Sequence, residues 1–318
     1  CGIATYSEHL LSEINEDYII FAPNNNNQCQ EKVIRSWELG GDNLDFLFNE
    51  IISNNITSIV IQFNYGFFEF KSLSHFIRKI YARNIKIIIF LHSTIDPKLD
   101  KTKRLFDIND VLSLSHRILV HTPSDLNRLK DIGLTKNVSL FPHGILDFDL
   151  QRTDHQYLKY SKNLIHFSTY GFCLPNKGFP ELIRAIDFLR KENFQCRLSL
   201  YTSLYDSKIS FLFYKELIDL INNLKLKEYV KINTTFMSDK ETIKQLSKSD
   251  LVVFPYQLTN ESASGAVRQA ISSSTPIAVT PLSIFDDVLP VVHILPGKTP
   301  SLIAKGLKSW SINDFGKP

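Results

Sequence analysis

Short apolar runs separated by amphipathic stretches fill the first half of the chain. The runs have the length and the β-branched and aromatic content of buried strands: YIIFAP at 18–23, SIVIQF at 58–63, IKIIIFLH at 85–92, RILVHT at 117–122 and VSLFPHG at 138–144. Between them, residues 44–53 and 73–82 repeat apolar positions at helical spacing. Strands that alternate with helices predict a parallel, doubly wound sheet.

A second series of the same kind occupies the second half. Its apolar runs are LIHFSTYG at 164–171, RLSLYT at 197–202, VKINTT at 230–235, LVVFPY at 251–256, PIAVT at 276–280 and VHILPG at 292–297. The polar stretch 147–162 between the two series has no strong period and reads as a linker. We therefore predict an α/β protein with a domain at 1–149, a linker at 150–162 and a second domain at 163–318.

Composition and charge narrow the classes of function. The chain has 318 residues, of which 43% are hydrophobic, enough for two packed cores. Its net charge is only +3 and its 36 Lys and Arg residues are dispersed, which argues against nucleic acid as the main ligand. A peripheral contact with an anionic membrane stays open, although no apolar stretch approaches the roughly 20 residues that span a bilayer.

The cysteines and the ends of the chain add two expectations. Cys1, Cys29, Cys173 and Cys196 match no zinc or disulfide spacing, so we interpret them as reduced thiols of a cytosolic protein. The first residues lack the layout of a signal peptide, and no Met begins the chain. Only one helical segment follows the last strand-like run. We expect the chain to be a segment of a longer protein.

The stretch after LVVF carries the first candidate chemistry. Ser264, Gly265 and Ala266 stand where the next helix should begin, so backbone N–H groups and the positive end of the helix dipole are accessible there. This arrangement suits an anion such as phosphate. Glu261, just before it, is a hydrogen-bond acceptor suited to a hydroxyl-rich group beside the phosphates. The alternative is an ordinary helix start that the serines cap.

Two cations lie near the predicted strand ends. Lys177 belongs to a Pro-Asn-Lys-Gly loop after the run 164–171, from which its charge can reach a diphosphate. The alternative is a solvated loop lysine. Arg268 lies in the helix after the proposed anion site and offers a bidentate partner, with a solvent-facing salt bridge as the alternative.

Three histidines and one glycine complete the set of candidates. His92 ends a strongly apolar strand, where a side chain can contact a substrate, although a lone His is usually structural. His121 and His143 also end strand-like runs, and we assign them to caps and packing. Gly2 and Ala4 stand ahead of a predicted helix that carries Leu10, and they form a second, weaker small-residue helix entrance.

Together these stretches resemble a known enzyme family. CGIATYSEHLL, IIIFLHS, FPHGI, GFCLPNKGFPELIRAI and ESASGAVRQAISSSTPIAVTPLSIFDDV, in this order, resemble the retaining GT-B glycosyltransferases of family 4. The likeness covers nearly the whole chain. It implies two Rossmann-like domains facing a cleft, with a nucleotide-sugar donor on the second domain and an acceptor on the first.

The resemblance also assigns residues. Gly2 is similar to the glycine of the first loop near the donor phosphate, His92 to the histidine near the transferred sugar, and Lys177 to the phosphate-clamping lysine. Glu261 is similar to the first Glu of an acidic pair and would hold hydroxyls of the transferred sugar. Ser264, Gly265, Ala266 and Arg268 then belong to the donor site.

Two departures from the family pattern stand at the donor site. Phe172 replaces an Arg that follows the glycine in the family, and Gln269, eight residues after Glu261, replaces the second Glu. In the family that Glu accepts hydrogen bonds from ribose. An amide oxygen can still accept such a bond, but without the assistance of charge. Altered nucleotide binding or inactivity therefore stays open.

The resemblance implies a hexosyltransferase without a cofactor. No Asp-x-Asp motif ends a strand-like run, so we expect its activity to be metal-independent, as the resemblance also implies. The expected partners are a nucleoside-diphosphate sugar and a glycan, lipid-linked or other hydroxyl acceptor in polysaccharide biosynthesis. The expected location is the cytoplasm or the inner face of a membrane. The alternative is a noncatalytic GT-B-like module of a larger protein that binds a sugar nucleotide or a partner.

Overall fold

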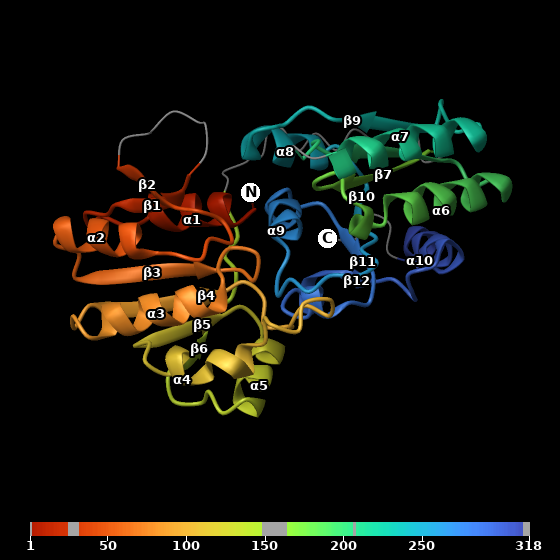
Figure 1. Ribbon diagram of the computed structural model, residues 1–318. Helices are drawn as coiled ribbons and strands as arrows, with labels where there is room; N and C mark the ends of the chain where they lie inside the picture. Colours follow the sequence, from red (N-terminus) through yellow and green to blue (C-terminus); the bar gives the residue numbers. More distant parts are fainter. Residues whose placement is uncertain (1, 25–31, 148–163, 206–207, 314–318) are drawn as a thin grey trace. The chain divides into compact units, whose positions relative to one another are not determined.

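The structure is a computed structural model that describes residues 2–24, 32–147, 164–205 and 208–313 (Figure 1). The chain divides into two compact units. Unit 1 comprises Cys1–Pro142 and Asn260–Ala263, and unit 2 comprises His143–Thr259 and Ser264–Pro318. The predicted linker, 150–162, lies outside the described residues. Four residues distant in sequence, 260–263, thus belong to the first unit.

The described residues of unit 1 form two parallel sheets. β1 (Ile20–Pro23) pairs with β2 (Val33–Trp37), while β3 (Ser58–Phe63), β4 (Lys86–Leu91), β5 (Arg117–Val120) and β6 (Val138–Leu140) form a second sheet in chain order. Its helices are α1 (Gly2–Ser12), α2 (Asp45–Ser53), α3 (Phe70–Tyr81), α4 (Asn109–Leu112) and α5 (Pro123–Asp131). The predicted strands and the helices α2 and α3 are confirmed.

Two features of unit 1 differ from the sequence-based expectation. Strand β2 was not predicted, because its run VIRSW carries Arg35 and Ser36 among only three apolar residues. Helix α1 includes Gly2 and Ala4, so the expected loop ahead of this helix is wrong. The reason is that Ala, Thr and Tyr all tolerate helix, and a glycine at its first residue costs little there.

In the part of unit 2 that the structure describes, the strands form a six-stranded parallel sheet. Its strands are β7 (Ile165–Tyr170), β8 (Cys196–Tyr201), β9 (Val230–Asn233), β10 (Leu251–Phe254), β11 (Ile277–Val279) and β12 (His293–Ile294). Their order in the sheet is β12-β11-β10-β7-β8-β9. Numbered within the unit, this is the 3-2-1-4-5-6 order of the Rossmann fold, in which the winding reverses between β7 and β10.

Helices cover this sheet and explain its apolar strands. They are α6 (Phe179–Lys191), α7 (Lys208–Asn223), α8 (Asp239–Leu246), α9 (Gly265–Ser272) and α10 (Pro300–Asn313), with α6 lying along α10 (Figure 1). In β10, Leu251 and Val253 pack in one core and Val252 and Phe254 in another. A strand buried on both faces must be apolar throughout, as the run LVVF is.

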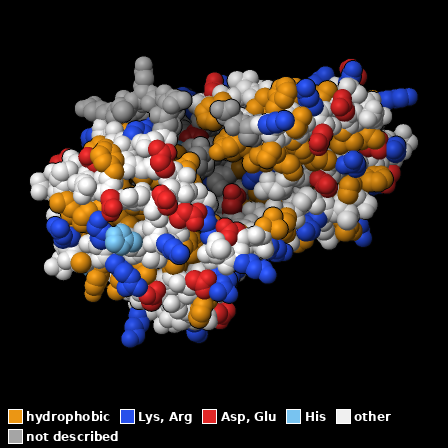
Figure 2. Space-filling model, viewed as in Figure 1, with side chains coloured by type: hydrophobic (Ala, Val, Ile, Leu, Met, Phe, Trp, Pro, Cys, Tyr) orange, Lys and Arg blue, Asp and Glu red, His pale blue; other side chains and the backbone are white. Residues whose placement is uncertain are grey.

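The surface and the cysteines bear on the expectations from composition. Figure 2 shows Lys and Arg interspersed with Asp and Glu on the face in view. Among the described residues, no helix is long and apolar enough to cross a bilayer. Cys173 and Cys196 are buried free thiols, and burial raises the pKa of the Cys196 thiol to about 12. Cys1 and Cys29 lie outside the described residues.

Candidate functional site

The loops after β7 and β10 meet where the winding of the unit 2 sheet reverses. Gly178 has φ +72°, and a Cβ there would lie 1.8 Å from the carbonyl oxygen of Pro255. Any other residue would collide with backbone, so glycine alone allows the loop to approach. The amide of Gln257 donates to the carbonyl of Asn176 at 3.0 Å and joins the same two loops. Open α/β sheets bind ligands at this place.

Lys177 is buried at this crossing point. It is 9% exposed, so the alternative of a solvated loop lysine is wrong. Its Nζ lies 4.0 Å from the centroid of the Tyr256 ring, a favourable cation–π distance. The Tyr256 hydroxyl lies 3.3 Å from Ser264 Oγ, at the start of α9. Tyr256, which no sequence motif marks, therefore links the lysine to the proposed anion site.

The start of α9 combines a cap with an accessible backbone. Ser264 caps the helix by accepting the amide of Val267 at 3.4 Å, as the alternative interpretation expected. Gly265 is exposed, and Ala266 is half-buried. His143 Nε2 lies 4.0 Å from the position of a Cβ on Gly265. His143, assigned to packing from the sequence, thus stands beside the small residues of the helix start.

Two polar side chains farther along α9 are bound within unit 2. Arg268 forms an ion pair with Asp287, and both side chains are only 8% exposed, so the salt bridge does not face solvent. Burial lowers the pKa of the Arg268 guanidinium, and Asp287 offsets part of this effect. Gln269 donates Nε2–H to Asp239 Oδ1 and hydrogen-bonds Tyr170, the last residue of β7. Gln269 therefore uses its amide as a donor.

His92, in unit 1, belongs to a chain of side-chain contacts. Its Nδ1 lies 3.3 Å from His121 Nε2, and His121 Nδ1 lies 3.0 Å from the carbonyl oxygen of Phe141. Because that carbonyl can only accept, His121 Nδ1 donates in this hydrogen bond, which orients the His121 ring toward His92.

The other nitrogen of His92 contacts Gln62. Nε2 lies 2.6 Å from Gln62 Oε1, which is hydrogen-bonding distance. Gln62 and His121 therefore hold the His92 ring at both of its nitrogens. The signal for Gln62 in the sequence was one polar residue near the end of the apolar run SIVIQF.

Tyr6, from α1, packs against both histidines. Its ring meets those of His92 and His121 edge to face, with centroids 5.1 and 5.5 Å apart. Burial raises the pKa of the Tyr6 hydroxyl to about 12. Gly2 is the exposed first residue of the same helix, one helical turn before Tyr6. The small residues at the start of the chain drew attention to Gly2, whereas the ring that contacts His92 from α1 is that of Tyr6.

Residues 260–263 bring Glu261 to unit 1. Ser93 Oγ donates to the carbonyl of Asn260, and the amide of Ser262 donates to the carbonyl of His92 at 3.1 Å. The two residues that flank Glu261 are thus bound to consecutive residues at the end of β4. The sequence pattern places Glu261 in the second domain, because Glu261 follows a strand-like run of that domain.

Asp125 accepts hydrogen bonds from several side chains, including that of Ser262 in the segment 260–263. Its side chain is fully buried and accepts from Thr94 Oγ1 at 2.6 Å, Thr122 Oγ1 at 2.6 Å, Ser262 Oγ at 2.8 Å and Arg128 Nη2 at 2.6 Å. Burial by itself raises the pKa of the carboxyl, but these hydrogen bonds outweigh it and lower the pKa. The sequence signal was a capping box, Thr122 to Asp125, at the start of α5.

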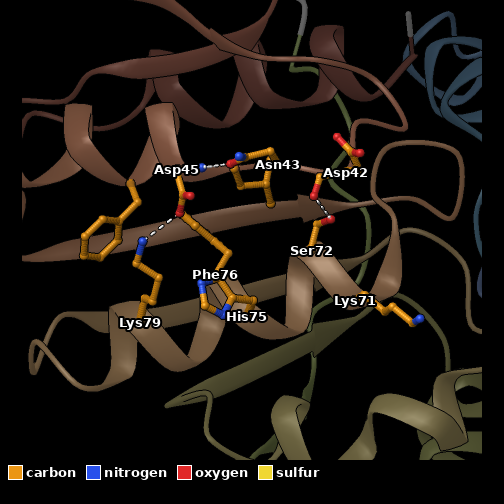
Figure 3. Close-up of a pocket in the computed structure, with 10 residues that line it drawn as sticks. Asp42, Asn43, Asp45, Lys71, Ser72, His75, Phe76 and Lys79 are labelled. Atoms are coloured by element: carbon orange, nitrogen blue, oxygen red, sulfur yellow. Dashed lines mark hydrogen bonds and ion pairs between the residues drawn. The ribbon is translucent and has the colours of Figure 1, made fainter.

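A depression of about 220 Å³ between α2 and α3 is a weaker candidate (Figure 3). Lys79 donates to Asp45 at 2.7 Å, and its ammonium lies 4.2 Å from the Phe48 ring centroid. This hydrogen bond and the charge of Lys79 lower the pKa of Asp45. Ser72 donates to the backbone carbonyl of Asp42. The polar groups already bind one another, so we assign no ligand here.

Comparison with known proteins identifies the fold. No protein-family model matches the sequence, and neither does any curated protein. Among solved structures, a sucrose-phosphate synthase from Thermosynechococcus elongatus has a TM-score of 0.68 at 14% identity, over 93% of this chain and 78% of its own. A UDP-forming trehalose-phosphate synthase from Burkholderia xenovorans has a TM-score of 0.67 at 11% identity, over 83% and 68% of the two chains.

The Anabaena protein HepE, solved with UDP and glucose, has a TM-score of 0.66 at 15% identity, over 89% of this chain and 76% of its own. At such identities a likeness shows the fold. The chain therefore has the α/β GT-B fold with parallel, Rossmann-like sheets, as the sequence predicted.

Proposed function

We propose that the chain is a retaining, metal-independent glycosyltransferase of the family 4 type. It would move a sugar from a nucleoside-diphosphate sugar to a glycan, lipid-linked or other hydroxyl acceptor, in the cytoplasm or at the inner face of a membrane. The observation that carries the proposal is the reversal point of the unit 2 sheet. There Lys177, Tyr256 and the start of α9 meet in a chain of GT-B fold.

Charge on the leaving group is the main demand of such a reaction. As the bond from the anomeric carbon to the diphosphate oxygen breaks, negative charge grows on that oxygen. Lys177, held over the Tyr256 ring, supplies a positive charge of fixed position. The backbone at Ser264, Gly265 and Ala266 supplies N–H donors and the helix dipole. The structurally similar proteins named for UDP support a nucleoside diphosphate as the leaving group.

Glu261 and His92, both in unit 1, would contact the transferred sugar. Glu261 accepts hydrogen bonds from its hydroxyls and favours a positively charged transition state. His92 contacts the same sugar, with a ring orientation that His121 and Gln62 hold. We assign no direct phosphate contact to Arg268, because its guanidinium is buried against Asp287. Gly2 retains the backbone role that the resemblance implies.

A second candidate is a noncatalytic module that binds a sugar nucleotide. It is favoured by the internal pairing of Arg268 with Asp287 and of Gln269 with Asp239, which occupies two polar groups of the donor site. Phe172, in place of a cation, packs edge to face on Tyr205, with centroids 5.7 Å apart. A binding module needs affinity without turnover.

One experiment separates the two candidates. The protein is incubated with a panel of UDP-, GDP- and ADP-sugars, and the release of nucleoside diphosphate is followed beside calorimetric titration of each diphosphate. Turnover with binding supports the transferase, and the anomeric configuration of the product, read by NMR, tests retention. Binding of a nucleoside diphosphate without turnover in the presence of any acceptor supports the noncatalytic module. Absence of binding to every diphosphate contradicts both.

A further inference from the structure

We propose that Ser262 is a positioning residue that, through Asp125, holds Glu261 against the end of β4. This inference rests on the proposed function and adds to it a residue with a definite task. Ser262 is 4% exposed, whereas Glu261 beside it is exposed. A buried serine next to an exposed carboxylate is the arrangement expected of an anchor and the group that it presents.

The backbone on both sides of Glu261 is fastened to consecutive residues of unit 1. Before it, the Asn260 carbonyl accepts the hydroxyl of Ser93. After it, the Ser262 amide donates to the carbonyl of His92 at 3.1 Å. Glu261 cannot shift along β4 without breaking one of these bonds. These two hydrogen bonds fix the base of the Glu261 side chain beside His92, the residue that the proposed function places at the transferred sugar.

Capping of helix α5 accounts for only part of the hydrogen bonds that Asp125 accepts. The capping box uses Oδ2, which accepts from Thr122 Oγ1 at 2.6 Å and from the Thr122 amide at 3.0 Å. Oδ1 instead accepts from Thr94, Arg128 and Ser262. Capping therefore explains one oxygen, while the other joins the turn after β4 to residues 260–263.

The rigidity of Asp125 makes it a suitable anchor for Ser262. A fully buried carboxylate with several donors on each oxygen has little freedom to turn. The Ser262 hydroxyl, at 2.8 Å, is therefore held by an acceptor of fixed position. A displacement of about 1 Å in a catalytic group can reduce turnover by about 100-fold. Removal of the Ser262 hydroxyl should thus lower kcat without changing the affinity for the nucleotide.

The test compares Ser262→Ala with Ser262→Thr, which keeps the hydroxyl. Ser273→Ala is the matched control, because Ser273 is 1% exposed and donates to the Ala270 carbonyl at 2.6 Å, away from Asp125. Each variant is measured for kcat, KM for the sugar nucleotide and affinity for the nucleoside diphosphate. NMR-detected hydrogen exchange of the Ser262 amide, which donates to His92, reports the position of the segment without turnover.

For Ser262→Ala we expect kcat to fall about 10-fold or more, while KM and the affinity for the nucleoside diphosphate change by no more than about 2-fold. The backbone amide of residue 262 should exchange faster than in the wild type. Ser262→Thr and Ser273→Ala should keep the slow exchange and most of kcat. Unchanged kcat and exchange in Ser262→Ala would overturn the inference, as would an equal loss of diphosphate affinity. If the wild type has no turnover, the proposed function fails, and unchanged exchange in Ser262→Ala would separately refute the anchor.

Discussion

Gln269 donates the N–H of its side-chain amide to the carboxylate of Asp239, from the second turn of α9 to the first residue of α8. The family resemblance predicted that an acidic residue at this position would face ribose. With Asp239 so close, a carboxylate at position 269 would meet another carboxylate. Beside Asp239, an amide at position 269 is therefore more favourable than a carboxylate, independently of any ligand.

Gln269→Glu should accordingly destabilise unit 2. The exchange turns a hydrogen bond into a repulsion between two carboxylates, for which we expect a loss of about 1–3 kcal/mol in the free energy of unfolding at pH 7. Urea unfolding measures it, with Gln269→Glu/Asp239→Asn as the control that restores a donor and an acceptor. Unchanged stability with tighter diphosphate binding would contradict the assigned direction of the bond.

Lys177→Ala should weaken binding of the nucleoside diphosphate by about 1.5–3 kcal/mol, the usual scale of a charge-assisted hydrogen bond. Calorimetry of wild type and variant gives this difference directly. Lys191→Ala is a suitable control, because Lys191 pairs with Asp187 on α6 and its side chain is 67% exposed. Equal affinity in all three proteins would remove Lys177 from the site.

Glu261→Gln separates sugar binding from nucleotide binding. If Glu261 holds the transferred sugar, turnover should fall by roughly 10- to 1,000-fold, or about 1.4–4 kcal/mol of barrier. Affinity for the bare nucleoside diphosphate should stay the same, because this ligand has no sugar. Steady-state kinetics and calorimetry are needed together. Intact turnover would exclude the sugar-binding role, and a parallel loss of both quantities would assign Glu261 to the nucleotide.

Gly178→Ala should disrupt the crossing of the loops after β7 and β10. The new methyl carbon would lie 1.8 Å from the Pro255 carbonyl oxygen, so we expect a loss of about 3 kcal/mol or more in unfolding free energy. Gly133→Ala is the control, since φ is +89° there but no atom lies within 4 Å, leaving a backbone cost of about 1–2 kcal/mol. Thermal unfolding compares the two. Equal losses would mean that the loops separate easily.

His166 makes the stability of unit 2 depend on pH. Burial, with the nearby charge of Arg197, lowers the pKa of the His166 imidazole to about 4. Nδ1 donates to the Lys248 carbonyl at 3.2 Å and Nε2 accepts from Ser199 at 2.8 Å, so the neutral ring fits. The unfolded state, with a pKa near 6.5, binds a proton that the folded state does not.

The free energy of unfolding should therefore be unaffected by His166 above about pH 7 and fall as the pH drops from about 6.5 to 4. The full loss is about 3 kcal/mol, at about 1.4 kcal/mol per unit of pKa. Urea unfolding of wild type and His166→Gln across this range isolates the imidazole from Asp250, whose pKa burial raises. Parallel pH curves for the two proteins would show that His166 is not buried as a neutral ring.

The sequence alone was sufficient for the fold class because its signals are local. Strands such as LVVF at 251–254, buried on both faces, must be apolar throughout, and the helices between them show their own period. The start of α9 and the loop of Lys177 were found for the same reason, since small residues and turn residues stand next to strand ends. Strand β2 was missed because its few apolar residues give too weak a local signal.

The partners of these residues depended on tertiary structure, because hydrogen bonds and packing join positions that no local pattern relates. The bond from Ser262 to Asp125 spans 137 positions in the chain, and that from Gln269 to Asp239 spans 30. Whether Lys177 is solvated or buried likewise depends on Tyr256, from another strand end. Periodicity and turn chemistry determined the helices and strands. The partner of each polar group was decided only in the tertiary structure, because burial requires polar groups to be paired and burial arises only when the strands come together.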